Sequence, residues 1–268
     1  MKLDSNLAWR QTSAAISANL DVLLPLAGVF FLLPRLALAL FMPEPELQQN
    51  MQPAEIAAAL RAYYTQILPV AIPMMLLQAA GTLAMITLFT DRSRPTVGHA
   101  IRTGFRCMLP YVAAEILFAM AAGIIGGAVL SVGALLGPAV VLAGAAVLGG
   151  LAYGFVRLAL VAPVIVTEGI GDPIRATVRS WRLTRGNGLR ILVFLGLMTL
   201  VLLVLTGALV SVGGAVAAMA MGAEPARMIS DTIASLLTAV YGAYVAAAIA
   251  AFHRQLAGPG DSYASRFE

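Results

Sequence analysis

The chain has 268 residues, of which 60% are hydrophobic and 11% are charged, and its formal net charge at pH 7 is +4. Soluble domains average roughly 25% charged residues, so this composition excludes an ordinary soluble protein. Several apolar runs exceed the roughly 18 residues that indicate a membrane-spanning helix, and their continuous apolar character excludes a β-barrel. The arginines punctuate these runs instead of forming a soluble patch. Membrane phosphates are therefore the expected partner, and nucleic acid is not.

Six apolar runs in chain order predict six transmembrane helices. They cover residues 22–41, 65–90, 108–134, 138–167, 190–221 and 230–252. Pro53 is expected to start a helix that leads out of a polar loop (43–64) into the second run, and Gly137-Pro138 predicts a tight turn between the third and fourth. The sequence thus indicates an all-α, polytopic membrane protein, with a six-span domain over 1–256 and a short polar, disordered tail over 257–268.

Three segments with amphipathic periodicity precede the first, third and fifth runs. They cover residues 4–20, 91–106 and 173–185. In the third segment Asp172 is a natural N-cap and Pro173 fits the first helical position. The apolar face of this helix contains Ile174, Val178 and Trp181. The basic face contains Arg175, Arg179 and Arg182. This pattern is typical of a helix that lies on an anionic membrane surface.

The layout of an amphipathic helix followed by two spans occurs three times, beginning near residues 4, 94 and 172. Sequence identity between the three units is slight, so a true threefold repeat stays an open alternative to three similar layouts. Most of the basic residues fall on the side of the two termini, and few fall on the other. The positive-inside rule then places both termini and the three amphipathic helices in the cytoplasm. The residues expected to face lipid there are Arg102, Arg106, Arg175, Arg179, Trp181 and Arg182.

The segment Arg157–Arg190 carries a resemblance to a known family. It contains Pro163 in an apolar run, Glu168, Pro173 and then the stretch SWRLTRGN over residues 180–187. This segment resembles the membrane-domain family named after glycerophosphoryl diester phosphodiesterases and related six-span bacterial proteins, and the layout matches over nearly the whole chain. The resemblance implies a multi-pass protein of the bacterial inner membrane. It carries no activity across, because the family's phosphodiester chemistry belongs to a separate soluble domain that this chain does not contain.

The sequence shows no motif that would carry a reaction. It has no HExxH, no paired-cysteine metal spacing, no phosphate loop and no GxSxG. His99 and His253 are the only histidines, and we expect both to be solvated rather than to bind a ligand. No cofactor, metal site or catalytic residue is predicted, and the protein is interpreted as a non-enzyme.

Two charged residues lie inside predicted spans. Glu115 is about 10 Å and Arg157 about 14 Å from the cytoplasmic ends of the third and fourth runs, at about 1.5 Å per residue. Charges are expensive in hydrocarbon and must pair or face water. Because a tight turn joins these runs, Glu115 and Arg157 are predicted to form an intramembrane ion pair. The alternative is that each side chain snorkels alone, Arg157 to a lipid phosphate and a protonated Glu115 to a backbone carbonyl.

These observations favour a non-catalytic, integral inner-membrane module that engages anionic lipid or a partner membrane protein. The alternative is a transporter or a permease-like subunit. Glu115, Arg157 and the prolines in the second run would favour transport, whereas no recognisable energising motif supports it. The sequence alone identifies no ligand, partner or oligomeric state.

Overall fold

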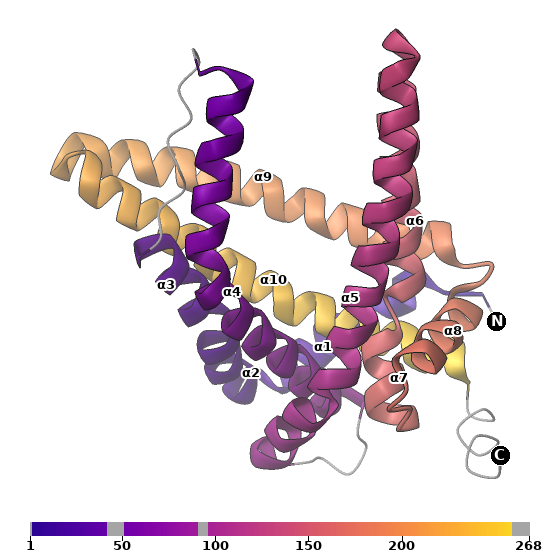
Figure 1. The fold of residues 1–268 in the computed structure, drawn as a ribbon. Helices are drawn as coiled ribbons and strands as arrows, with labels where there is room; N and C mark the ends of the chain where they lie inside the picture. The colour runs from indigo at the N-terminus through magenta and orange to yellow at the C-terminus, as the bar shows by residue number, and fades with distance from the viewer. Residues whose placement is uncertain (1, 42–50, 91–95, 259–268) are drawn as a thin grey trace.

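The computed structural model describes residues 2–41, 51–90 and 96–258, and within these ranges every regular element is a helix (Figure 1). Six helical segments there are long and apolar enough to cross a membrane. The elements in chain order are α1 (Ser5–Ala18), α2 (Leu20–Ala27), the π-helix η1 (Gly28–Leu32), α3 (Leu33–Phe41), α4 (Pro53–Thr90), α5 (Val97–Leu135), the short η2 (Gly137–Ala139), α6 (Val140–Leu158), α7 (Val161–Glu168), α8 (Pro173–Thr184), α9 (Gly188–Met221) and α10 (Ala223–Ala257). The protein is therefore an all-α, multi-pass membrane protein.

Several helices are longer than the sequence predicted. Of the amphipathic segment 91–106, residues 97–106 belong to the same continuous helix as the third span, α5, so over these residues the second interfacial helix is not a separate element. Pro110 lies inside α5, where a proline removes one backbone hydrogen bond and bends a helix without having to end it. Helix α4 begins at Pro53 as predicted and continues to Thr90. Residues 91–95 and most of the predicted tail lie outside the described residues.

Helix α10 is the central helix of the molecule. Its last third is rich in alanine, and Ala246, Ala248 and Ala251 are fully buried. Small side chains let other helices approach closely inside a membrane protein, and α10 contacts α1, α4, α7, α8 and α9. We call this packed region the base; it comprises residues 3–18, 79–90, 154–195 (which include α7 and α8) and 239–257. Both clusters of buried hydrophobic residues include side chains of α10.

Long-range hydrogen bonds bring the ends of four segments together at the base. The backbone N–H of Leu3 donates to Oδ1 of Asn187 at 2.8 Å, and Arg190 donates to the carbonyl of Leu3 at 2.9 Å. At the other end of the chain, Arg254 donates to the carbonyl of Phe89 at 2.6 Å. The start of the chain, the start of α9, the end of α4 and the end of α10 therefore lie on one side. This agrees with the candidate spans, because an even number of them separates any two of these four points.

Two helical hairpins leave the base in different directions (Figure 1). We call them the α5–α6 arm (residues 116–153) and the α9–α10 arm (residues 196–238). Each turns at a glycine with positive φ, Gly137 in one and Gly222 in the other. Large apolar side chains near the turns are open to the surroundings, as at Ile124 and Leu142, which are 70% and 74% exposed. In a membrane protein such side chains contact lipid.

Candidate functional site at helix α8

Helix α8 begins where the sequence predicted, and it presents two distinct faces. Oδ1 of Asp172 accepts hydrogen bonds from the N–H groups of Ile174 and Arg175 at 2.8 and 3.2 Å, which satisfies the free donors of a helix start. The buried face consists of Ala176, Ser180, Leu183 and Thr184. The outward face consists of Ile174, Val178 and Trp181, which are 62%, 45% and 43% exposed. The apolar stripe of α8 therefore faces away from the protein.

Ser180 attaches α8 to a break between α6 and α7. Its hydroxyl donates to the carbonyl of Arg157 at 2.6 Å and accepts the N–H of Leu160 at 3.2 Å. The break has a local cause, because Pro163 has no N–H to donate to the carbonyl of Ala159. Helix α6 ends at Leu158 and α7 starts at Val161. Ser180 thus satisfies two of the backbone groups that the break exposes.

Arg157 is enclosed by two aromatic rings. Its guanidinium carbon lies 4.8 Å from the centre of the Tyr153 ring and 5.2 Å from that of Trp181. The same group donates to the Tyr153 hydroxyl at 2.9 Å and to Oγ1 of Thr184 at 3.4 Å. The negative faces of aromatic rings stabilise a cation with little water present. The charge of Arg157 is therefore held by rings and hydroxyls.

The predicted ion pair between Glu115 and Arg157 is not formed; among the described residues, no ion pair joins them. Glu115 is exposed on α5, and its carboxyl group interacts with the hydroxyl of Tyr111, one turn earlier. The two spans are neighbours, as the packing of Gly154 against Phe118 shows. Depth along each helix does not determine rotation about the helix axis, and the two side chains leave their helices in different directions.

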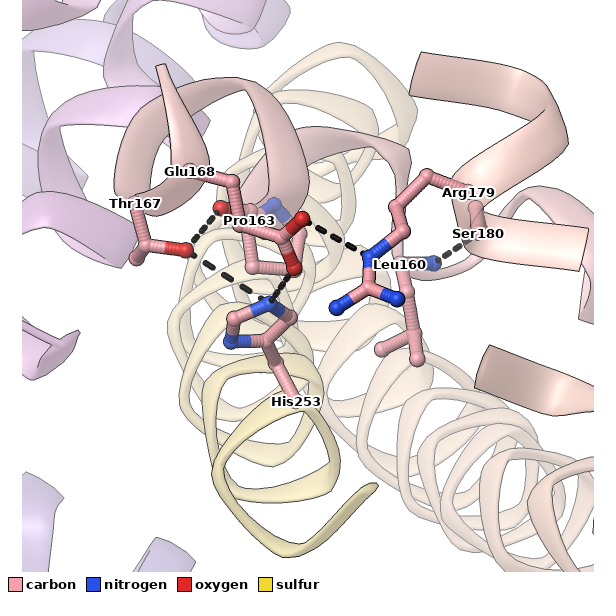
Figure 2. A network of polar contacts seen from close by, with 7 residues as sticks. All are labelled: Leu160, Pro163, Thr167, Glu168, Arg179, Ser180 and His253. Carbon is pink, nitrogen blue, oxygen red and sulfur yellow. Dashed lines mark hydrogen bonds and ion pairs between the residues drawn. The ribbon is translucent and has the colours of Figure 1, made fainter. Parts of the chain in front are cut away.

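A buried polar cluster joins α7, α8 and α10, and Figure 2 shows its members. Oε2 of Glu168 lies 2.8 Å from Nε of Arg179, and Oε1 lies 3.1 Å from Nε2 of His253. The side chains of Glu168, His253 and Arg179 are 7%, 8% and 25% exposed. Thr167 donates its hydroxyl to the carbonyl of Pro163 at 2.6 Å and lies 3.5 Å from Nε2 of His253. This cluster locks three elements of the base together.

The cluster corrects two predictions. Arg179 was predicted to face lipid, but it points inward to Glu168 because it lies closer to the buried face of α8 than the other arginines do. His253 was predicted to be solvated after the last span, but α10 continues to Ala257 and buries it. His99 is exposed, as predicted. The sequence showed the carboxylate of Glu168 next to a Gly-Ile-Gly-Asp stretch (residues 169–172). It did not show that His253, 85 residues later, is the partner of this carboxylate.

The remaining predicted lipid-facing residues are exposed. They are Arg102 and Arg106 on α5 and Arg175, Trp181 and Arg182 on α8. Arg175 makes only a surface ion pair with Asp172 at 3.5 Å, and its side chain is 83% exposed. Such a pair contributes little and leaves the guanidinium available. The exposed apolar stripe of α8 therefore has free positive charge along one edge.

The cluster has the chemistry of a structural lock, since its polar atoms are engaged with one another. Within residues 2–41, 51–90 and 96–258, no three His, Cys, Asp or Glu side chains are grouped to hold a metal ion. Comparisons with protein-family models, with curated proteins and with solved structures gave no match. The interpretation of function therefore depends on the geometry of α8 and its surroundings.

Proposed function

We propose that this protein is a non-catalytic membrane module that engages anionic lipid headgroups through the outward face of α8. The observation that carries the proposal is the exposure of Ile174, Val178 and Trp181 beside Arg175 and Arg182, while the opposite face of the same helix is buried. An apolar stripe inserts below the headgroups and its flanking arginines meet phosphates. Each basic residue near such a surface contributes about 1 kcal/mol.

The same proposal includes an orientation. The end of the molecule that holds residue 2 and the end of α10 carries most of the basic residues, namely those of α8 and Lys2, Arg10, Arg102, Arg106, Arg190 and Arg254. Arg61 and Arg227 belong to helix starts at the other end. This asymmetry supports placement of the termini and the base in the cytoplasm. The inner membrane of a bacterium is what the resemblance of residues 157–190 implies. Arg102 and Arg106 on α5 are exposed as well.

The separation of Glu115 from Arg157 weakens the transporter alternative. A transport path needs polar groups that face one another or a shared cavity inside the membrane. Arg157 is instead enclosed by Tyr153 and Trp181, and Glu115 is exposed on the outside of α5. A partner membrane protein bound to the same stripe of α8 is the other occupant that the experiment below distinguishes.

The experiment uses the fact that the chain has only two tryptophans. A Trp9→Phe variant leaves Trp181 as the sole indole, on the outward face of α8. The purified protein is placed in nanodiscs of phosphatidylcholine that contain a minor fraction of brominated phosphatidylglycerol or, in a matched sample, brominated phosphatidylcholine. We expect the anionic lipid to quench Trp181 roughly fivefold more effectively, as expected for about 1 kcal/mol. Raised salt should remove this preference.

The matched variants are Arg175→Gln with Arg182→Gln, and Arg227→Gln as the control at the other end of the molecule. The first pair should remove the preference and the control should keep it. Quenching that is equal for the two brominated lipids, or absent with both because a partner copy covers Trp181, would contradict the proposal.

A further inference from the structure

A second surface of the molecule has the shape of a lipid site. A groove of about 550 Å³ lies between α1, α9 and α10. One end is formed by Ser5 and Asn6, in the first turn of α1. From there it follows α9 from Phe194 to Leu205, with α10 as the other wall. Eleven residue-to-residue steps of helix correspond to about 16 Å, which matches the roughly 15 Å of hydrocarbon in one leaflet.

The walls of the groove suit hydrocarbon. Apart from the turn of α1, its lining is apolar or aromatic. The indole of Trp9 packs against Tyr244 and Phe194, with ring centres 6.3 Å apart in both pairs. Tyr241 has a hydroxyl, but this group lies 2.6 Å from Oγ1 of Thr199, which itself donates to the carbonyl of Leu195. The Tyr241 hydroxyl is therefore satisfied within the protein.

The groove suits an acyl chain in length and polarity. It follows α9 over about 16 Å, close to the hydrocarbon depth of one leaflet, and its walls along this length are apolar or aromatic. A helix of a second copy would meet the same apolar walls, but it would exclude lipid and leave Trp9 unquenched by either brominated lipid in the test below.

The charge at the polar end of the groove, near Ser5 and Asn6, favours one kind of lipid headgroup. Arg190 lies one helical turn before Phe194 on α9, is exposed, and reaches the carbonyl of Leu3, two residues before Ser5. Lys2 adds a second exposed cation. The carboxylate at this end belongs to Asp4, and it accepts the N–H of Leu7 as the cap of α1. The balance at this end of the groove is positive, which favours an anionic headgroup.

We propose that this groove binds one anionic phospholipid, with an acyl chain along α9 and α10 and the phosphate beside Arg190 and Lys2. The inference rests on the proposed function, because it names a lipid that the base retains, but it concerns a different surface. The lipid closes the gap between α1 and the α9–α10 arm, so it acts as a filler that fixes α1 against two spans.

The test uses the other tryptophan. A Trp181→Phe variant leaves Trp9, whose ring lines the groove. In nanodiscs of phosphatidylcholine with a minor fraction of phosphatidylglycerol brominated on its acyl chains, Trp9 should be quenched about fivefold more effectively than by the same fraction of brominated phosphatidylcholine. Equal quenching by the two lipids would mean that Trp9 meets only the bulk bilayer, and this result would overturn the inference.

Two exposed valines on α9 provide a matched pair of variants in this background. Val201 lines the groove and is 56% exposed, whereas Val212 lies outside it and is 64% exposed. Val201→Phe should fill the groove and remove the preference for the anionic lipid, and Val212→Phe should keep it. Arg190→Gln retains a donor for the Leu3 carbonyl but should also lose the preference. A preference that survives Val201→Phe would overturn the inference.

The two tryptophan reporters separate this inference from the proposed function. A lipid preference at Trp181 without one at Trp9 would leave the α8 surface intact and reject the groove. The reverse result would reject the role of α8 and retain a lipid bound between α1, α9 and α10.

Discussion

The base and the two arms are built from similar apolar residues, but different forces hold them. In the base, Leu83, Leu160 and Phe252 are fully buried, and hydrogen bonds connect segments more than 180 residues apart. In the α5–α6 arm, Leu135 and Leu142 are 86% and 74% exposed. A leucine in the base therefore contributes by packing against protein, whereas a leucine in the arm contributes by contacting lipid.

The sharpest way to break this comparison is a pair of identical substitutions. Leu160→Ala in the base should lower the free energy of unfolding by about 3 kcal/mol, because it removes a buried side chain and leaves a cavity. Leu142→Ala in the arm should change it by less than about 0.5 kcal/mol. The measurement is reversible unfolding in mixed micelles. Similar losses at both positions would mean that the arm is packed in the same way as the base.

The polar cluster of the base provides the next largest effect. Glu168→Gln removes the charge that Arg179 and His253 share and should cost about 2 kcal/mol in the same unfolding assay. The matched control is Asp231→Asn, since Asp231 forms a surface pair with Arg227 at 3.8 Å. That pair should contribute less than about 0.5 kcal/mol. If Glu168→Gln were as mild as the control, the cluster would not be holding α7, α8 and α10 together.

The smallest effect tests where the base ends and the α5–α6 arm begins. A Cβ on Gly154 would collide with the ring of Phe118, whereas a Cβ on Gly150, one turn earlier, meets nothing within 4 Å. Gly154→Ala should therefore destabilise the hairpin by about 1 kcal/mol. Gly150→Ala should be neutral or slightly stabilising, because alanine favours the helix. Equal effects of both variants would place the boundary of close packing elsewhere.

The sequence was sufficient for features that are local. Apolar length identified the six spans, and Asp172 with Pro173 identified the start of α8. It also identified Arg102, Arg106, Arg175 and Arg182 as exposed residues. These features depend on composition, capping and periodicity, and each of them is determined within one or two helical turns.

The partners of the buried charges could not be found in this way. The depth of Glu115 and Arg157 followed from helical rise. The direction in which each side chain leaves its helix depends on the packing between helices, such as Phe118 against Gly154 and Trp181 beside Arg157. The contact between Glu168 and His253 joins residues 85 positions apart. The continuity of α5 through residue 106 was missed because a change from amphipathic to apolar character was interpreted as a boundary, although the backbone needs no break there.

The position of α10 has a consequence for the order in which the molecule can be made. Helix α10, against which α1, α4, α7 and α9 pack, follows all of them in the chain, and Phe252 and His253 lie near its end. Until α10 is synthesised, α1 lacks the helix against which it packs, and Glu168 has Arg179 without His253. Chains fold from the N-terminus as they are synthesised, at about 5–20 residues per second. A chain truncated before residue 240 would therefore hold five inserted spans with no common core, a species that quality-control proteases can recognise and remove.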